Sequence, residues 1–311
     1  MADDRLPVLY FDRPFPDELR DLIDGRALVV GPDEADIALA DAVIVGVVRR
    51  WDAEAIALGP RLRVISRSGI GYDNIDLDAA EAAGVTVCYA PDAPTVSTAE
   101  HTMALLLAIT KQVPVQQGRA RAGLGTPLMP SALELDGCTL GLVGLGRIAR
   151  RVAVAARALG MNVIAVDPLL PASPLAEVMM TTWAELLAEA DVVSLHAPAL
   201  PETVHLVDDR ALAAMKPGSY LVNCARGTLV DQDALLQALD HGHLAGAALD
   251  VTVPEPLPAG HPLLEHPNVI VTPHVASSTA AGRRRLFAHA IDNAIAVLEG
   301  RPASTVPART A

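Results

Sequence analysis

The sequence predicts an α/β protein with two domains, each a doubly wound parallel sheet covered by helices, and a cleft between the domains. Short apolar segments alternate with helical segments along nearly the whole chain. Hydrophobic residues make up 51% of the 311 residues but aromatic residues only 3%, which indicates the aliphatic core typical of buried parallel strands. A glycine-rich turn at 144–149 lies mid-chain, so a separate domain can precede it.

The first domain is expected to contain five strands connected by helical segments. Each strand is a short apolar run, and LDAAEAAG (77–84) has the glycine stop of a helix end. The expected strands are 7–11, 27–30, 42–48, 62–68 and 85–91, and the helical segments are 16–23, 52–59 and 77–84.

A long helical segment, 95–121, leads into the second domain, and Pro114 should bend or break it. The Gly- and Pro-rich stretch 122–137 indicates a linking loop. The second series has expected strands at 138–146, 162–167, 191–198, 219–227, 244–251 and 268–274, and expected helices at 147–160, 182–190, 209–215, 231–242 and 276–299. We expect residues 1–93 with 276–311 to form one domain and residues 94–275 the other.

Composition excludes several classes of function. The formal net charge of −13 disfavours nucleic acid and anionic membranes as partners. The three cysteines, Cys88, Cys138 and Cys224, form no C-x-x-C pair, so we expect neither a disulfide framework nor a metal site. The first residues lack the pattern of a signal peptide, and the longest apolar runs are too short to span a bilayer. These features favour a cytoplasmic protein.

The segment GLGRIA at 144–149 predicts a dinucleotide-binding turn of the Rossmann type. It follows an apolar strand and opens a helix. Gly144 permits the tight turn, and Gly146 lets the backbone approach a pyrophosphate at the helix N-terminus. Asp167 follows Gly144 by 23 residues, at the end of the next strand. An acid at this position binds the ribose hydroxyls of NAD and repels the 2′-phosphate of NADP, so NAD is the predicted cofactor.

From about residue 42 to residue 290 the chain resembles the D-isomer-specific 2-hydroxyacid dehydrogenases, a family that includes phosphoglycerate dehydrogenases and glyoxylate or hydroxypyruvate reductases. Several separate motifs carry the resemblance in one order. They are RSGIGYDNID (67–76), STAEHTMALLLA (97–108), GLVGLGRIAR (141–150), MKPGSYLVNCARGTLVDQDAL (215–235), ALDVTVPEP (248–256) and TPHVASST (272–279).

The resemblance implies a catalytic triad of Arg226, Glu255 and His274. Reduction of a 2-oxo acid needs a hydride, a proton and an anchor for the carboxylate. The fork of Arg226 can hold the carboxylate and the carbonyl oxygen. Histidines titrate near neutral pH, so His274 can supply the proton and take it back in oxidation. Glu255 can bond the far imidazole nitrogen, fixing its tautomer and stabilising the imidazolium.

The remaining predicted site residues bind cofactor or substrate. The resemblance gives Asp250 one of two roles, contact with the nicotinamide amide or support of Arg226. Ser68 and Gly69 either present backbone N–H groups to the substrate carboxylate or only form a turn. His101 and His196 are expected to support the cofactor cleft structurally. The predicted cofactor-binding residues are Gly144, Leu145, Gly146, Arg147, Ile148, Asp167, Cys224 and Asp250, and no metal-binding residue is predicted.

These observations predict an enzyme that moves a hydride between NAD(H) and C2 of a small D-2-hydroxy or 2-oxo acid. Glyoxylate, hydroxypyruvate and a 3-phosphoglycerate-like compound all remain candidate substrates. A non-catalytic NAD-sensing protein of the same fold and a formate- or phosphite-type dehydrogenase are the alternatives. Formate enzymes are expected to carry glutamine where Glu255 stands, which disfavours that alternative. By resemblance, the apolar helix near 97–110 indicates a homodimer.

Overall fold

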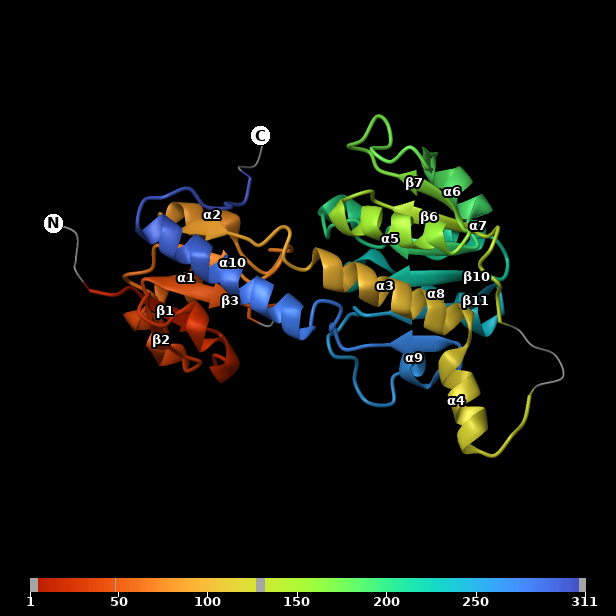
Figure 1. Ribbon diagram of the computed structural model, residues 1–311, viewed down its shortest axis with the longest axis horizontal. Coiled ribbons are helices and arrows are strands. Elements are labelled where there is room, and N and C mark those ends of the chain that lie inside the picture. The colour runs from red at the N-terminus through yellow and green to blue at the C-terminus, as the bar shows by residue number, and fades with distance from the viewer. Residues whose placement is uncertain (1–4, 48, 127–131, 308–311) are drawn as a thin grey trace. The chain divides into compact units, whose positions relative to one another are not determined.

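The computed structural model describes residues 5–47, 49–126 and 132–307, and the chain divides into two compact units (Figure 1). The first unit comprises Met1–Pro94 and Ser278–Ala311, and the second comprises Thr95–Ser277. These bounds lie within two residues of the expected domain boundaries. Part of the expected linking loop, 127–131, lies outside the described residues.

The first unit contains a five-stranded parallel sheet in the order β2-β1-β3-β4-β5. This is the flavodoxin-like order of a doubly wound sheet. All five expected strands are confirmed, whereas the segment 16–23 forms a 3₁₀ helix. The elements are β1 (Val8–Phe11), η1 (Asp17–Leu22), β2 (Leu28–Val30), η2 (Glu34–Leu39), β3 (Ala42–Val45), α1 (Ala53–Ala57), β4 (Val64–Arg67), α2 (Leu77–Ala82), β5 (Thr86–Cys88) and α10 (Ala280–Leu298).

Helix α10 returns from the end of the second unit to cover the first sheet (Figure 1). Its buried residues, among them Ile291 and Ala294, pack against Leu9 and Ile44 of the strands. The Ser66 hydroxyl also donates to the carbonyl of Ala290 at 2.8 Å. The first unit is therefore built from both ends of the chain.

The second unit contains a seven-stranded parallel sheet in the order β12-β11-β10-β9-β6-β7-β8. From the centre of the sheet, β6, β7 and β8 follow one another to one edge, and β9, β10, β11 and β12 follow one another to the other edge. Strand order therefore reverses between β6 and β9, as in dinucleotide-binding folds. The strands are β6 (Thr139–Val143), β7 (Asn162–Val166), β8 (Val178–Met180), β9 (Val192–Leu195), β10 (Ser219–Asn223), β11 (Leu244–Leu249) and β12 (Val269–Val271). The edge strand β8 was not predicted.

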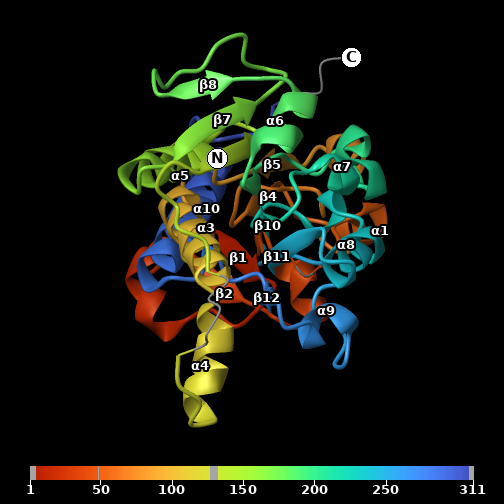
Figure 2. The same cartoon turned by 90° about the vertical axis from the view of Figure 1, so that its right-hand side faces the viewer.

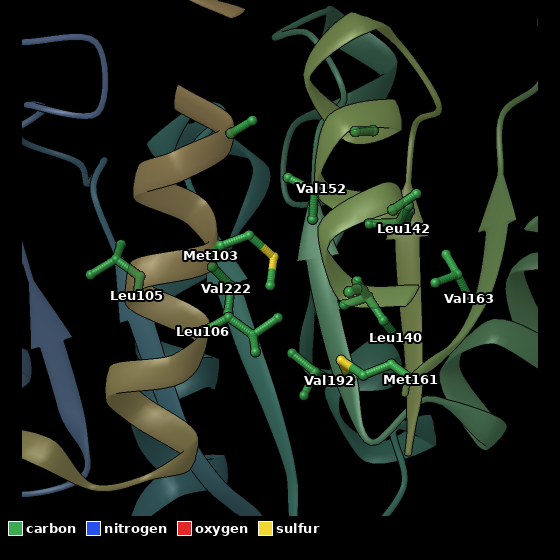
Figure 3. Close-up of a cluster of buried hydrophobic side chains, with 14 of the residues drawn as sticks. Met103, Leu105, Leu106, Leu140, Leu142, Val152, Met161, Val163, Val192 and Val222 are labelled. Atoms are coloured by element: carbon green, nitrogen blue, oxygen red, sulfur yellow. The ribbon is translucent and has the colours of Figure 1, made fainter. Parts of the chain in front are cut away.

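Helices cover both faces of this sheet (Figure 2). Met103 and Leu106 of α3 and Val152 of α5 bury one face, shown in Figure 3. Helices α6, α7 and α8 bury the other face. The helices are α3 (Thr95–Thr110), α4 (Val113–Arg121), α5 (Arg147–Ala158), α6 (Trp183–Glu189), α7 (Asp209–Ala214), α8 (Gln232–Asp240) and α9 (Pro262–Glu265), with short 3₁₀ turns η3 (Pro201–Thr203) and η4 (Gly227–Leu229).

The break predicted at Pro114 is confirmed. Helix α3 ends at Thr110, Gln112 adopts a left-handed conformation with φ of 53°, and Pro114 lies in the first turn of α4. Pro is tolerated there because the first-turn N–H groups have no intrahelical partner. Helix α4 has no buried residue and projects away from the rest of the second unit (Figure 1).

Within the described ranges, no helix combines the length and apolar character that crossing a membrane requires. The same part of the chain holds no group of three or more His, Cys, Asp or Glu side chains arranged to bind a metal ion.

Candidate active site

The glycine-rich turn lies where strand order reverses, between β6 and α5. Gly144 has φ of 92°, and a Cβ there would lie 2.9 Å from the carbonyl oxygen of His196. Gly146 precedes α5, and no side chain caps the first turn of that helix. A Cβ at Gly146 would meet nothing within 4 Å. The uncapped N–H groups and the open space at Gly146 fit a phosphate approaching the helix N-terminus.

The other residues of the turn divide between core and surface. The side chain of Leu145 is fully buried in the core beneath the turn, and Ala149 packs there too. Ile148 is half-buried against the same core, whereas Arg147 is exposed. Arg147 and the backbone of the turn therefore remain accessible to a ligand, while Leu145 anchors the turn.

Asp167 follows β7 and faces the turn. One carboxylate oxygen accepts the N–H of Leu145 at 2.9 Å, and the other accepts the N–H of Leu169 at 3.0 Å. Each carboxylate oxygen can accept more than one hydrogen bond, so capacity for ribose hydroxyls remains. Asp167 thus also fixes the conformation of the turn, a structural role that the sequence did not predict.

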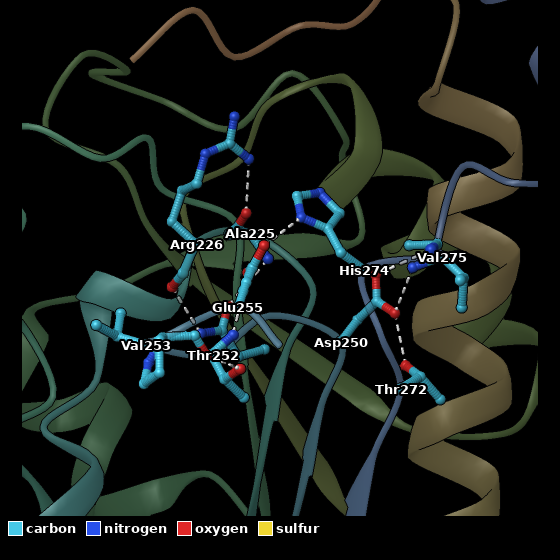
Figure 4. Close-up of polar contacts among 12 residues, drawn as sticks. Ala225, Arg226, Asp250, Thr252, Val253, Glu255, Thr272, His274 and Val275 are labelled. Atoms are coloured by element: carbon cyan, nitrogen blue, oxygen red, sulfur yellow. Dashed lines mark hydrogen bonds and ion pairs between the residues drawn. The ribbon is translucent and has the colours of Figure 1, made fainter. Parts of the chain in front are cut away.

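Arg226, Glu255 and His274 follow three neighbouring strands, β10, β11 and β12. Because these strands are parallel, their carboxyl ends meet at one edge of the sheet. Figure 4 shows Glu255 lying between the Arg226 and His274 side chains. The structure therefore brings the predicted triad together within the second unit.

His274 and Glu255 form a direct ion-pair contact. The imidazole Nδ1 lies 2.9 Å from Glu255 Oε2, and the side chains are 26% and 35% exposed. Glu255 Oε1 also accepts the backbone N–H of Thr252 at 3.1 Å, which fixes the carboxylate. Because an ionised carboxylate only accepts, Nδ1 carries the proton in this contact. Nε2 is then the nitrogen that can exchange a proton with a ligand.

The backbone around Arg226 is held by its neighbours. Its carbonyl accepts the side-chain N–H of Asn223 at 2.8 Å, and its Nη1 donates to the Ala225 carbonyl at 2.7 Å. A Cβ at Gly227 would lie 2.3 Å from the carbonyl oxygen of Thr252, so only glycine fits beside Arg226. The chain is thereby fixed on both sides of this half-buried side chain.

The structure gives Asp250 a role that the sequence did not predict, which is support of the His274 segment. Its side chain is fully buried and its carboxylate accepts the N–H groups of Val275 and Ala276, each at 2.9 Å. The Thr272 hydroxyl donates to it at 2.5 Å. Burial raises the pKa of Asp250, but hydrogen bonds from His101, Thr272 and these N–H groups outweigh burial and lower the pKa overall.

Three further predicted residues lie around the turn and on α3. Burial raises the pKa of Cys224 to about 12, so its thiol stays protonated. His196 follows β9, its Nε2 lies 3.0 Å from the Ser194 hydroxyl, and burial lowers its pKa to about 4. A neutral His196 whose backbone packs against Gly144 agrees with the structural role expected for it. His101 contacts Thr272 and Asp250 from α3.

The predicted substrate residues Ser68 and Gly69 lie in the first unit, after β4. The Ser68 N–H and hydroxyl both donate to the Val45 carbonyl, at 3.0 and 2.9 Å. Both Ser68 donors are thus already used within the first unit, and a contact of Ser68 with the substrate stays a prediction. Gly69 accepts the Ala90 N–H at 2.8 Å through its carbonyl. The role of the Gly69 N–H stays a prediction.

Comparisons with known proteins identify the family. Residues 103–276 match the NAD-binding domain of the D-isomer-specific 2-hydroxyacid dehydrogenases. D-3-phosphoglycerate dehydrogenase of Mycobacterium leprae is 43% identical over 263 residues, which is 83% of this chain. The chain spans about half the length of that relative, 50%. Glyoxylate reductase of Thermofilum pendens is 38% identical, with 84% of this chain and 79% of the relative covered.

A solved structure extends the match over both units. A protein of Thermus thermophilus superposes with a TM-score of 0.87 at 42% identity, covering 96% of this chain and 100% of the other. The family profile covers the glycine-rich turn and the Arg226, Glu255 and His274 segments. The chain therefore belongs to the D-isomer-specific 2-hydroxyacid dehydrogenase family.

Proposed function

We propose that this protein is an NAD-dependent oxidoreductase that transfers a hydride between NAD(H) and C2 of a small D-2-hydroxy or 2-oxo acid. The observation that carries the proposal is the 2.9 Å contact between His274 Nδ1 and Glu255. It leaves the opposite imidazole nitrogen to exchange a proton, at the same sheet edge as an arginine and a dinucleotide turn.

The second unit serves as the cofactor domain in this proposal. The uncapped start of α5, the open face of Gly146 and the Asp167 carboxylate would hold NAD. When bound, the nicotinamide supplies or accepts the hydride. The Asp167 charge favours the ribose hydroxyls of NAD over the 2′-phosphate of NADP. We infer further contacts to the cofactor from Leu145, Arg147, Ile148, Cys224 and Asp250.

In this proposal His274 is the general acid and base. In reduction, its Nε2 donates a proton to the oxygen that develops negative charge at C2, and in oxidation it removes that proton. The Glu255 carboxylate balances the positive charge on the imidazolium and holds the ring in place. Such a positioned acid–base group contributes on the order of 10²–10⁴ in rate.

Arg226 binds the substrate. Its planar guanidinium can hold the carboxylate through two parallel N–H···O bonds and polarise the C2 carbonyl. The first unit then acts as the substrate domain, with the Gly69 backbone as a proposed contact to the substrate. Candidate substrates are glyoxylate, hydroxypyruvate and a 3-phosphoglycerate-like acid.

We also infer a cytoplasmic homodimer. All three cysteines are free thiols, in keeping with a reducing compartment. Helix α4 buries no side chain within the chain, and Val113 on it is 53% exposed. An apolar groove beside this helix is lined by residues that include Ile109, Val115 and Ile270. A second copy of the chain would cover these surfaces.

The test is NADH oxidation with a panel of 2-oxo acids: glyoxylate, hydroxypyruvate, pyruvate, phenylpyruvate and phosphohydroxypyruvate. We expect turnover with at least one of them, and loss of that turnover in His274→Asn with NADH binding retained. NADH binding without turnover on the whole panel would contradict the proposal and favour an NAD-sensing protein. Phosphite and formate with NAD belong in the same screen, because oxidation of either would indicate a different dehydrogenase.

A further inference from the structure

The backbone of His274 adopts a conformation that must be held in place. Its φ is 53°, in the left-handed region that non-glycine residues rarely occupy. This conformation is disfavoured for an L-residue because it brings Cβ close to the following carbonyl oxygen. The His274 N–H donates to the carbonyls of Asp250, at 2.8 Å, and Thr272, at 3.0 Å. The orientation of the imidazole therefore depends on the residues that fix this turn.

Asp250 and Thr272 form the clamp on the turn. The Asp250 carboxylate takes the two N–H groups that follow His274, and the Thr272 hydroxyl donates to Asp250 Oδ1 (Figure 4). Thr272 precedes His274 and Val275 follows it, so the hydrogen bonds of Asp250 hold the turn on both sides of His274. The geometry of the clamp in turn depends on the side chain that hydrogen-bonds to the Thr272 hydroxyl and the Asp250 carboxylate.

His101, on α3, contacts both residues of the clamp. Its Nε2 lies 3.1 Å from the Thr272 hydroxyl oxygen and 3.3 Å from Asp250 Oδ1. Since the Thr272 hydroxyl gives its hydrogen to Asp250, His101 must donate from Nε2 to satisfy either contact. The His101 side chain is 22% exposed. Helix α3 contacts both β11 and β12, so it is a rigid support.

We propose that His101 is a positioning residue for the proposed reaction, whose Nε2–H locks the Thr272–Asp250 clamp and thereby holds the His274 imidazole against Glu255. His101 touches neither Glu255 nor the His274 ring, so its effect passes through the clamp. A general acid displaced by about 1 Å can lose on the order of 10²-fold in rate, so even a small relaxation of the turn is measurable.

Two matched substitutions separate the hydrogen bond from side-chain volume. His101→Leu removes the donor and keeps a side chain of similar bulk, whereas His101→Gln places an amide N–H donor near the position of Nε2. His241→Leu, at the exposed end of α8, is the control for replacing a histidine elsewhere in the same unit. Thermal unfolding and NADH affinity confirm that each variant is folded.

The primary measurement is hydrogen–deuterium exchange of the amides of Val275 and Ala276, followed in the full-length protein with NADH bound. We expect His101→Leu to exchange these amides about tenfold faster than wild type, while His101→Gln and His241→Leu exchange at the wild-type rate. Equal exchange in all four proteins would overturn the proposal. This readout needs no substrate and no turnover, so its failure is distinguishable from a failure of the proposed hydride transfer.

The second measurement is turnover with the best 2-oxo acid. We expect His101→Leu to lower kcat about 10- to 100-fold with the KM for NADH unchanged, and His101→Gln to restore most of the loss. Combined with Thr272→Val, His101→Leu should add little further loss, because both act on one clamp. Additive losses, or no rescue by His101→Gln, would show that His101 does not act through Thr272 and Asp250.

Discussion

At the scale of single residues, the proposed proton transfer depends on two side chains, His274 and Glu255. Glu255 is held by the Thr252 N–H through one oxygen and contacts His274 through the other. A carboxylate fixed in this way cannot follow the imidazole if the ring moves. The pair therefore sets both the tautomer of His274 and the direction in which its second nitrogen points.

Substitutions in this pair should reduce turnover without weakening cofactor binding. His274→Asn removes the proton donor and should lower kcat by about 10²–10⁴, whereas Glu255→Gln keeps an acceptor without the charge and should cost less. Steady-state kinetics with an NADH binding titration checks this. A Glu255→Gln variant as impaired as His274→Asn would contradict the role of the charge.

Asp167 is the residue that should decide between NADH and NADPH. Asp167→Asn keeps an acceptor for the turn but removes the charge that repels a 2′-phosphate. We expect the preference for NADH over NADPH, measured as the ratio of kcat/KM values, to fall roughly tenfold. Asn162, at the exposed start of β7, provides a control as Asn162→Ser. An unchanged ratio in Asp167→Asn would argue against a ribose contact.

The sequence predicted the place of the candidate site residues after the strands better than it predicted the hydrogen bonds that hold them. Arg226, Glu255 and His274 stand in motifs whose order places them after successive strands. The hydrogen bonds of the Asp250 carboxylate could not be predicted, because they depend on the orientation of that side chain. The hydrogen bond from the Ser68 N–H to the carbonyl of Val45, in a neighbouring strand, could not be predicted for a similar reason.

At the scale of elements, the segment from β11 to His274 is held by a buried charge. The pKa of Asp250 is lowered: burial opposes ionisation, but the hydrogen bonds it accepts favour the charged form more strongly. A carboxyl whose folded pKa lies below its unfolded value stabilises the fold at pH above the unfolded value. This stabilisation is lost as the pH falls through the lower, folded pKa.

Asp250→Asn should therefore lower the free energy of unfolding at neutral pH, by about 1–3 kcal/mol. The difference from wild type should close as the pH falls below about 3.8, the ordinary pKa of an aspartate. Denaturant unfolding at a series of pH values checks this. A difference that stays constant down to the acid transition would mean that the Asp250 charge does not contribute.

Most helices and strands could be predicted from the hydrophobic pattern of the sequence. Where the structure differs from the prediction, the difference has a physical reason. The expected strands of both units formed because each is a mostly aliphatic run between helical segments. Strand β8 was not predicted because it has only three residues, Val178–Met180, at a sheet edge, and Met179 is 60% exposed. The segment Asp17–Leu22 has helical spacing but forms a 3₁₀ helix. Pro16 stands at its N-cap and provides no side-chain cap, whereas short α-helices such as α1 begin at a capping aspartate.

At the scale of the whole molecule, the first unit depends on the return of the chain. Helical periodicity in 276–299 predicts a helix but does not state which sheet it covers. That assignment came from the family resemblance, and the structure packs α10 against β1, β3 and β4. The exposed apolar surface on and beside α4 is the part of the second unit for which we infer a partner copy.

Sedimentation velocity should accordingly give a particle of about twice the 32.5 kDa mass of one chain. Val113→Asp places a charge on α4 and should shift the particle to the mass of one chain. Leu39→Asp, at a position 51% exposed in the first unit, should leave the mass unchanged. A monomeric wild-type protein at micromolar concentration would contradict the homodimer.

The transfer of deuterium from NADH deuterated at C4 of the nicotinamide to the product tests the central claim most directly. With the preferred 2-oxo acid, we expect a 2-hydroxy acid that carries one deuterium at C2 and is a single D enantiomer. His274→Asn should form little of it. A product without deuterium at C2, or no product although NADH binds, would contradict hydride transfer to C2 and with it the proposed function.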